Sequence, residues 1–301
     1  MVWLLAAESR KLLRPLVWGA VLTIVAFLVL LTWAAANNAR SGLASPRVPS
    51  VCVGSTAPAC GRVIQRADGD ALAAARATRM LEQPGAVGQV AAGMIASLPG
   101  LLLIALVSGG HWGGEWGSRT IRSLLAHEGR RTRVLLAKWL TVWATGVAAM
   151  IACWVVLAVL APVLAGTSGL PSPGTPLWQG LGSSLSCAGH AVVVLGLFSM
   201  IGIAAGTIAR GQLAATAAAA GSMLVALVMA GVGGIGAWSP ASFVQAWMGF
   251  GPADYLPTNF WSRFVASGPH PGQLGAFAGI AATAAVAAGI ARWQFAKDVT
   301  A

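Results

Sequence analysis

Six long apolar stretches constrain this chain more than any other feature of its sequence. Each runs for roughly 20 residues or more, the length at which an α-helix crosses the hydrocarbon core of a bilayer. The stretches are Pro15–Ala35, Val87–Ser108, Trp139–Pro162, Ser184–Ile208, Gln212–Trp238 and Gln273–Ala291. Inside lipid the backbone has to satisfy its own hydrogen bonds, so such segments form helices. The sequence therefore predicts an all-α integral membrane protein with six transmembrane helices in one transmembrane domain, residues 1–301.

The charge content agrees with a membrane protein. Only 9% of the residues are charged and the mean hydropathy is +0.75, whereas a soluble domain is about 25% charged. The net charge of +11 does not indicate nucleic acid, because the basic residues flank apolar spans instead of forming a stripe on a soluble domain. Arginine greatly outnumbers lysine, and alanine and glycine dominate, which is typical of a GC-rich bacterium. We expect a multi-pass protein of the bacterial cytoplasmic membrane, surrounded by membrane lipids.

The distribution of Lys and Arg between the loops predicts the orientation. With a cytoplasmic N-terminus, the inner segments hold 12 basic residues and the outer segments hold 7. Six of the outer seven lie in one long loop, residues 36–86, and long loops cross the membrane despite their charge. The first apolar run is too long for the core of a signal peptide, so we expect it to be retained. Both ends of the chain are therefore predicted to lie inside.

The six spans contain no Asp, Glu, Lys or Arg, although ion-coupled transporters usually keep such a residue at mid-membrane. The chain has no zinc-protease or serine-hydrolase motif and no metal-ligand spacing. A P-loop lysine follows glycine, but the three lysines follow Arg10, Ala137 and Ala296. We therefore expect no enzyme activity from this chain by itself, and an external energy source for any work it does.

His190 is the one histidine within the six predicted spans. Two readings stay open: a neutral imidazole hydrogen-bonded between helices, or a contact to a substrate.

A predicted cytoplasmic loop, residues 109–138, concentrates the charge of the chain. Its segment 114–138 carries 8 of the 27 charged residues. Helical spacing places Gly117, Ile121, Leu124 and Leu125 on one face, and places Arg119, Arg122 and Ser123 on the other. Paired glycines, Gly113 and Gly114, predict a break before this short amphipathic helix, and Gly129 predicts its end. The helix is either an anchor on anionic lipid or a docking helix for a cytoplasmic partner.

The pattern Gly-Glu-x-x-x-Arg-Thr-Ile-Arg-x-Leu-Leu, followed by Arg-Arg and Lys, resembles the cytoplasmic loop of type-2 ABC transporter permeases. In that family the loop joins the second and third spans and forms the coupling helix that seats in the ATPase subunit. This chain has His-Glu-Gly at 127–129 where the family often has a proline. The resemblance assigns ATPase coupling to Gly114, Glu115, Arg119, Thr120, Ile121, Arg122, Leu124, Leu125, Arg131 and Lys138.

Three further segments are similar to the same family. Residues 1–14 resemble its amphipathic entry helix, and "WQFAKDV" resembles its C-terminal ending. For the aromatic, proline-containing segment 239–272, the resemblance implies short re-entrant helices in the outer leaflet before the sixth span. An interfacial anchor is the alternative for that segment, since Trp and Tyr favour the headgroup level.

The four cysteines divide by location. Cys52 and Cys60 lie in the long outer loop, where the compartment permits a disulfide, so they form either a bond or two free thiols. Cys153 and Cys187 lie in spans and are expected to be small buried apolar residues.

The resemblance implies the permease subunit of an ABC exporter, which forms a homodimer or heterodimer with a second permease copy. ATP and Mg would be bound by the partner ATPase, with no cofactor in this chain. Uncharged spans rich in Ala and Gly favour an amphipathic or hydrophobic substrate. Two other classes stay open: an ATP-independent carrier, and a non-transporting membrane scaffold or sensor.

The predicted topology can be tested with reporter fusions. A reporter after Ser168 should be active outside, because the second outer loop carries no Lys or Arg, and a reporter after Ala301 should be active inside. A cytoplasmic signal at Ser168 would contradict the six-helix map.

Overall fold

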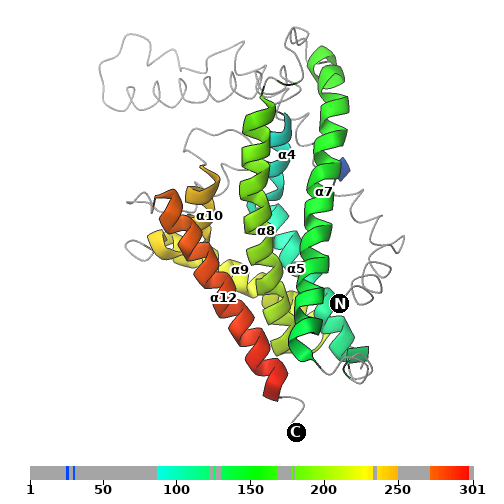
Figure 1. The fold of residues 1–301 in the computed structure, drawn as a ribbon, viewed down its shortest axis with the longest axis vertical. Helices are drawn as coiled ribbons and strands as arrows, with labels where there is room; N and C mark the ends of the chain where they lie inside the picture. Colours follow the sequence, from blue (N-terminus) through cyan, green and yellow to red (C-terminus); the bar gives the residue numbers. More distant parts are fainter. Residues whose placement is uncertain are drawn as a thin grey trace, which may run out of the picture.

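The structure, a computed structural model, is a bundle of helices (Figure 1). It describes residues 25, 26, 30, 87–118, 120, 121, 125, 130–167, 178, 180–232, 236–249 and 272–297. Within these residues every regular element is helical. The elements are α4 Val87–Ile95, α5 Leu98–Gly117, α7 Arg131–Thr167, α8 Leu181–Ala209, α9 Gln212–Gly231, the 3-10 turn η2 Gly236–Trp238, α10 Pro240–Met248 and α12 Gln273–Lys297.

Four of these helices, α7, α8, α9 and α12, are long and apolar enough to cross a membrane, and α4 with α5 makes a fifth if the bent pair is one span. The all-helical, membrane-spanning class is therefore confirmed at this level, while the count of six remains a prediction. Of the first predicted span, the described residues are Val25, Ala26 and Leu30, and Val25 is buried in the core. The predicted entry helix, residues 1–14, and the outer loop, residues 36–86, lie outside the described residues.

The second predicted span differs from expectation in two ways. It is bent by 54° between α4 and α5, because Pro99 lies in the first turn of α5 and a proline has no N–H to continue the preceding helix. The helix then continues through Gly113 and Gly114 to Gly117, so the predicted break at these glycines is wrong. Gly113 is packed closely, since a methyl there would lie 2.5 Å from Cβ of Ala215, whereas Gly114 has only ordinary contacts with Gln212 from 3.8 Å.

The other helices follow the predicted spans but extend beyond the apolar residues. The third begins at Arg131 instead of Trp139, and the last ends at Lys297 instead of Ala291. The backbone hydrogen-bond ladder does not stop at the first charged residue, and long Lys and Arg side chains keep their charge in water while their stems pack. The fifth ends earlier than predicted, at Gly231, and is followed by η2.

Helix α8 is the centre of the bundle. Of the apolar stretch of α8 that is long enough to cross a membrane, 78% is buried inside the bundle, whereas the corresponding share is 22% to 28% for α7, α9 and α12. Its Gly202 and Gly206 face α5, where Gly109 and Gly113 stand at the same four-residue spacing. A methyl group at Gly206 would lie 2.8 Å from Cδ1 of Trp112, and one at Gly113 would lie 2.7 Å from the carbonyl oxygen of Gly211. Small residues at this spacing let helix backbones approach closely in lipid.

Side chains of three neighbouring helices donate hydrogen bonds to carbonyl oxygens of α8. The hydroxyl of Ser108 on α5 lies 2.7 Å from the Ser199 oxygen. The stacked indoles of Trp139 and Trp143 on α7 donate to Gly196 and Val192, both at 2.9 Å. The fourth donor is the indole of Trp247 on α10, 3.0 Å from the His190 oxygen. Because lipid offers no competing donors, these bonds fix how each helix is rotated against α8.

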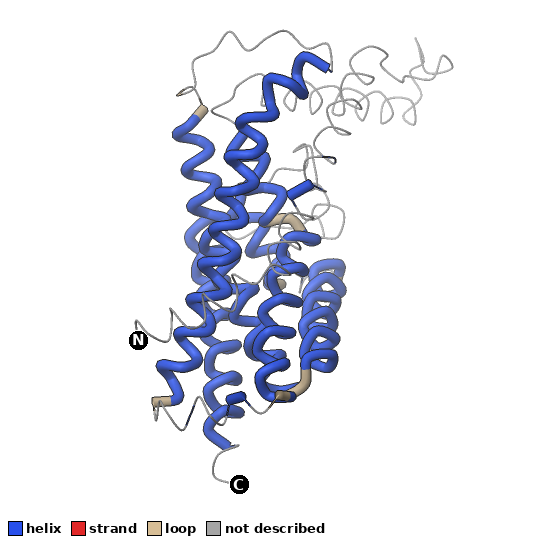
Figure 2. Tube along the Cα trace, turned by 90° about the vertical axis from the view of Figure 1, so that its right-hand side faces the viewer, coloured by secondary structure: helices blue, strands red, loops and turns tan. Residues whose placement is uncertain are grey.

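The charged residues that the structure describes lie near helix ends. The last turn of α5, the start of α7, the junction of α8 with α9 and the last turn of α12 meet at one end, which we call the charged end. Arg131 of α7 donates to the Ala296 oxygen of α12 at 3.1 Å, and the guanidinium of Arg210 lies 5.8 Å from the Trp116 ring centroid. Figure 1 shows these segments at the lower end of the bundle, with α10 beside the first turns of α12 farther up, and Figure 2, turned by 90°, shows the C-terminus at the same lower end.

Within the predicted re-entrant segment, 239–272, the structure describes the short helix α10. It begins with Ser239 as its N-cap, whose hydroxyl accepts the N–H of Ser242 at 3.1 Å, and it ends at Gly249 with a positive φ of 68°. Its Phe243 packs against Gly279 of α12. A short helix thus lies within this segment, its re-entry into the outer leaflet stays a prediction, and residues 250–271 lie outside the described part of the chain.

Gly202→Ala tests the close contact of α5 with α8. The added methyl would overlap the Ser108 hydroxyl and the Ala105 carbonyl oxygen, and such overpacking typically costs about 1–3 kcal/mol. Gly189→Ala is the matched control, because the same helix has nothing within 4 Å of a methyl there. We expect the melting temperature to fall for Gly202→Ala alone. Equal melting temperatures for the two variants would contradict the packing.

Candidate functional site

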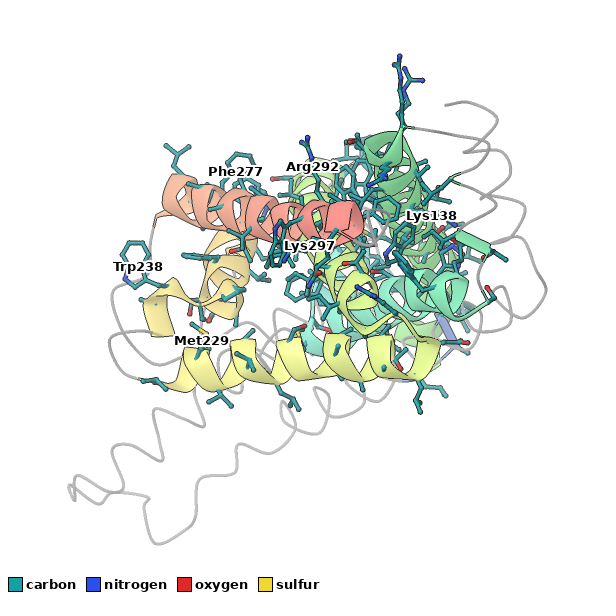
Figure 3. The ribbon with its side chains drawn as sticks, turned by 90° about the horizontal axis from the view of Figure 1, so that it is seen from below. Lys138, Met229, Trp238, Phe277, Arg292 and Lys297 are labelled. Carbon is teal, nitrogen blue, oxygen red and sulfur yellow. The ribbon has the colours of Figure 1, made fainter. Side chains whose placement is uncertain are left out.

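A buried ion pair links α5 to α7 at the charged end. Lys138 Nζ donates to Oε1 of Glu115, and the two side chains are 2% and 10% exposed. The partners are 23 residues apart in the chain, and Figure 3 shows Lys138 among the helix ends seen from this side. Both residues belong to the predicted coupling set, and the structure brings them together within one chain.

This arrangement corrects the predicted position of Glu115. The sequence places it at the beginning of a short helix in a loop, whereas it lies in the last turn of α5, with Lys138 inside α7. The negative end of a helix dipole disfavours a carboxylate, so the helix end does not stabilise Glu115. Its compensation comes from the ammonium of Lys138.

Aromatic side chains pack together at the same end of the bundle. Phe295 of α12 makes edge contacts with Trp112 and Trp116 of α5, with ring centroids 5.7 Å and 5.9 Å apart. They belong to one buried apolar cluster, which we call the charged-end cluster. Its buried members are Trp112, Ile121, Val134, Leu135, Met200, Ile203, Ala204, Ala287, Ala291 and Phe295. The burial of the Glu115 and Lys138 side chains keeps water away from the pair, which strengthens the attraction within it and raises the cost of losing either partner.

The predicted apolar face of the loop turns toward its own bundle. Ile121 is 2% exposed and belongs to the charged-end cluster, and Leu125 packs against that cluster. Ile121 is therefore covered by this chain itself, and the coupling role that the resemblance assigns to it stays a prediction. Thr120 is exposed, and its hydroxyl lies 3.4 Å from the Glu115 carbonyl oxygen. The other members of the predicted set in this segment, Arg119, Arg122 and Leu124, lie outside the described residues.

The three arginines at the start of α7 and just before it differ in exposure. Arg130 and Arg133 are exposed. Arg131 is half-buried and its guanidinium donates to the last turn of α12. Gly114 is close to α9, with 3.8 Å between a methyl placed there and Oε1 of Gln212. Of the predicted coupling residues that the structure describes, Gly114 thus lies near α9, Arg131 contacts α12, and Glu115 and Lys138 contact each other.

His190 lies in α8, away from the charged end. Its ring meets Trp247 of α10 edge to face, with centroids 4.5 Å apart, and its backbone oxygen accepts the Trp247 indole N–H. Trp247 also contacts Phe277 of α12 at 5.2 Å. His190 therefore takes part in packing between helices through its ring and its carbonyl, and its predicted contact to a substrate stays a prediction.

The cysteines of the spans are thiols, with Cys153 buried and Cys187 half-buried. Cys52 and Cys60 lie outside the described residues. Among the described residues there is no group of three His, Cys, Asp or Glu that could hold a metal ion.

The ion pair is the feature that sequence reasoning missed. Glu115 and Lys138 were both singled out, but each was assigned to an external partner. One signal was present in the sequence: each residue adjoins an apolar span, and these spans are consecutive and therefore antiparallel if both cross the membrane. Such a geometry places the end of one span beside the start of the next.

Lys138→Met tests the pair by leaving the Glu115 carboxylate buried without its cation. Breaking a buried pair in this way costs about 3–5 kcal/mol, so we expect a large loss of stability, measured by unfolding in mixed detergent micelles. The double variant Glu115→Gln/Lys138→Met removes both charges and should recover most of that loss. Equal stability of the single and the double variant would show that the two charges do not interact.

Comparison of the chain with protein-family models, with curated proteins and with solved structures finds no match. The functional argument therefore depends on the residues of this chain and on the arrangement described above.

Proposed function

We propose that this chain is the permease subunit of an ATP-driven ABC exporter, and that a separate ATPase subunit binds at the loop between α5 and α7. One observation carries the proposal: the two helices that flank the loop are joined by the buried Glu115–Lys138 pair, while Arg130 and Arg133 beside the loop are exposed. The charged end thus combines a rigid link inside with basic groups facing outward.

The link gives a displaced loop a way to move the bundle. Because Glu115 and Lys138 are paired, a force on the loop acts on α5 and α7 together and not on one helix alone. Helix α5 in turn packs on α8 and α9 through glycines, with backbone atoms near 3 Å from where a methyl would lie. Close-packed interiors have low compressibility and transmit displacement. Motion at the loop would therefore reach the central helix α8.

The exposed charges favour a water-soluble partner with an acidic surface. Arg130 and Arg133 are exposed, and the sequence adds Arg119 and Arg122 within the same loop. Complementary charge mainly sets the rate and specificity of encounter between two proteins. In this role the loop presents its cations to the ATPase, while Ile121 fixes the loop to its own bundle.

The sequence supports the proposed energy source and cargo. None of the three lysines follows a glycine, so a P-loop is absent and ATP with Mg would be held by the partner. The spans are uncharged and rich in Ala and Gly, which favours an amphipathic or hydrophobic substrate moved outward. Two permease copies, identical or different, would enclose the translocation pathway between them.

The double variant Arg130→Glu/Arg133→Glu tests the docking surface. Each reversal acts at an exposed contact worth at most about 1 kcal/mol, so together we expect roughly tenfold weaker recovery of the ATPase with the tagged chain from native membranes. Arg79→Glu/Arg263→Glu, with both residues in segments predicted to lie outside, is the control with the same change of charge. Abundance of the chain should be unchanged in all variants.

Three outcomes would contradict the proposal. If no ATPase is recovered with the unmodified chain, or if both reversal variants recover it equally, the loop is not its docking surface. If the purified chain alone moves a substrate across vesicles without ATP, the chain is an ATP-independent carrier.

A further inference from the structure

Arg210, in the turn between α8 and α9, has an unusual backbone conformation. Its φ of 54° and ψ of 14° lie in the left-handed region, and among the described residues no other residue apart from glycine has a positive φ. It caps α8, since its N–H donates to the Gly206 oxygen at 3.1 Å. Glycine usually takes this position, because a side chain there is strained. The chain places its glycine one residue later, at Gly211, whose φ of −147° lies in the extended region that other residues adopt.

The side chain of Arg210 makes a contact with α5. Its guanidinium carbon lies 5.8 Å from the centroid of the Trp116 ring, within the range of a cation–π interaction. Arg210 is exposed, and at an exposed site such a contact contributes no more to stability than the left-handed conformation costs. Stability alone therefore does not favour an arginine here. Strained residues cluster at functional positions, so the backbone conformation points to a task for the Arg210 side chain.

The ring of Trp116 depends on packing for its position. Three other indoles, on α7 and α10, donate to carbonyl oxygens of α8. The ring N–H of Trp116, in contrast, is buried and has no acceptor among the described residues. The ring packs against the charged-end cluster, where its edge contact with Phe295 has 5.9 Å between centroids, and the Arg210 guanidinium lies over it. Removing that guanidinium would leave the ring held by apolar packing.

Trp116 lies where α5 passes into the proposed docking loop, since α5 ends at Gly117. The residue before it, Glu115, is held by Lys138 of α7. Neighbouring residues of a helix point about 100° apart, so the two contacts hold the last turn of α5 from different sides. One contact comes from the helix that follows the loop, and the other comes from the turn between α8 and α9. Together they determine the place at which the loop begins.

The turn that carries Arg210 is itself packed against α5. A methyl at Gly113 would lie 2.7 Å from the carbonyl oxygen of Gly211, so the two backbones are in close contact one turn before Trp116. A side chain at Gly211 would have room, since a methyl there would have the Ala209 oxygen, at 3.9 Å, as its nearest neighbour. Arg210 thus reaches Trp116 from a fixed base, and the next position along the chain offers space for a control substitution.

We propose that Arg210 is a positioning residue for the docking loop. From the turn between α8 and α9 its guanidinium holds the Trp116 ring, and so it fixes the α5 end of the loop in the place that the ATPase meets. The inference rests on the proposed function, because it assigns Arg210 a part in ATPase docking that acts through Trp116. Loss of the guanidinium lowers the population of the docking-competent loop. A residue that only capped α8 would be replaced by glycine without loss.

Fluorine NMR of the purified full chain tests the contact itself. The chain is labelled with fluorinated tryptophan, and the signal that is missing from the Trp116→Phe variant belongs to Trp116. We expect Arg210→Gln to shift this signal, because the ring loses the neighbouring charge, and Arg210→Lys to shift it less. Arg292→Gln, which removes another exposed arginine, should leave the signal in place. An unmoved Trp116 signal in Arg210→Gln would overturn the proposal.

Recovery of the ATPase with the tagged chain from native membranes tests the positioning. A cation–π contact at an exposed site corresponds to about a two- to fivefold change in an equilibrium constant, so Arg210→Gln should lower the recovery by about that factor. Arg210→Lys keeps a cation over the ring and should keep most of the recovery.

A swap variant, Arg210→Gly/Gly211→Arg, is the matched control for charge. It keeps the net charge of the chain and places glycine in the left-handed position. We expect it to lose recovery as Arg210→Gln does, because the guanidinium no longer starts from the position that reaches Trp116. Its melting temperature should be no lower than that of the unmodified chain, since the backbone strain is relieved.

Three results would overturn the inference while the unmodified chain still recovers the ATPase. Full recovery by Arg210→Gln shows that the contact does not position the loop. Full recovery by the swap variant shows that net charge matters and the contact with Trp116 does not. A melting temperature that falls together with the recovery in each variant shows that Arg210 only stabilises the fold. If the unmodified chain recovers no ATPase, the proposed function fails and this inference fails with it.

Discussion

The close approach of α5 to α8, where Gly202 faces Ser108 and Ala105, is the contact on which the rest of the described structure depends. Helices in lipid gain little from burying apolar side chains against each other, so their association relies on close packing and on hydrogen bonds. Glycine on α8 supplies the packing, and the hydroxyl of Ser108 on the Ser199 oxygen supplies a bond. Because α9 packs on the other glycines of α5, one helix is held between two others. Its last turn then has a fixed place at the charged end.

The position of that last turn gives the charged end its chemistry. It carries Glu115 into contact with Lys138 and brings Trp112 and Trp116 against Phe295 of α12. The cations outside this cluster keep contact with water or with the aromatic rings beside them, as Lys297 does over Trp293. The charged end therefore has an inner layer in which charge is compensated and an outer layer of excess positive charge. The proposed ATPase surface at the loop belongs to that outer layer.

Several predictions made from the sequence hold in the structure because they depend only on local composition. The apolar runs that begin near Ser184 and at Gln212 and Gln273 are helices α8, α9 and α12, with ends within a few residues of the prediction apart from the early end of α9 and the extension of α12 to Lys297. The prediction for the region between Gly109 and Lys138 is less accurate. The paired glycines Gly113 and Gly114 predict a break in the helix, since glycine destabilises an isolated helix. In the bundle both glycines are helical, and at Gly113 the close approach of α9 leaves no room for a larger side chain.

The sequence by itself determined that this chain folds in a lipid bilayer and which of its segments are apolar enough to lie there. Apolar length decides whether a segment crosses lipid, and that quantity is read directly from consecutive residues. Only the tertiary structure decided which charged side chains are buried against each other and which are exposed. Glu115 and Lys138 look like their neighbours in the sequence, yet they are buried against each other, while Arg130 and Arg133 remain exposed. The physical reason is that the cost of burying a charge depends on the partner it finds, and that partner comes from another helix, 23 residues away along the chain.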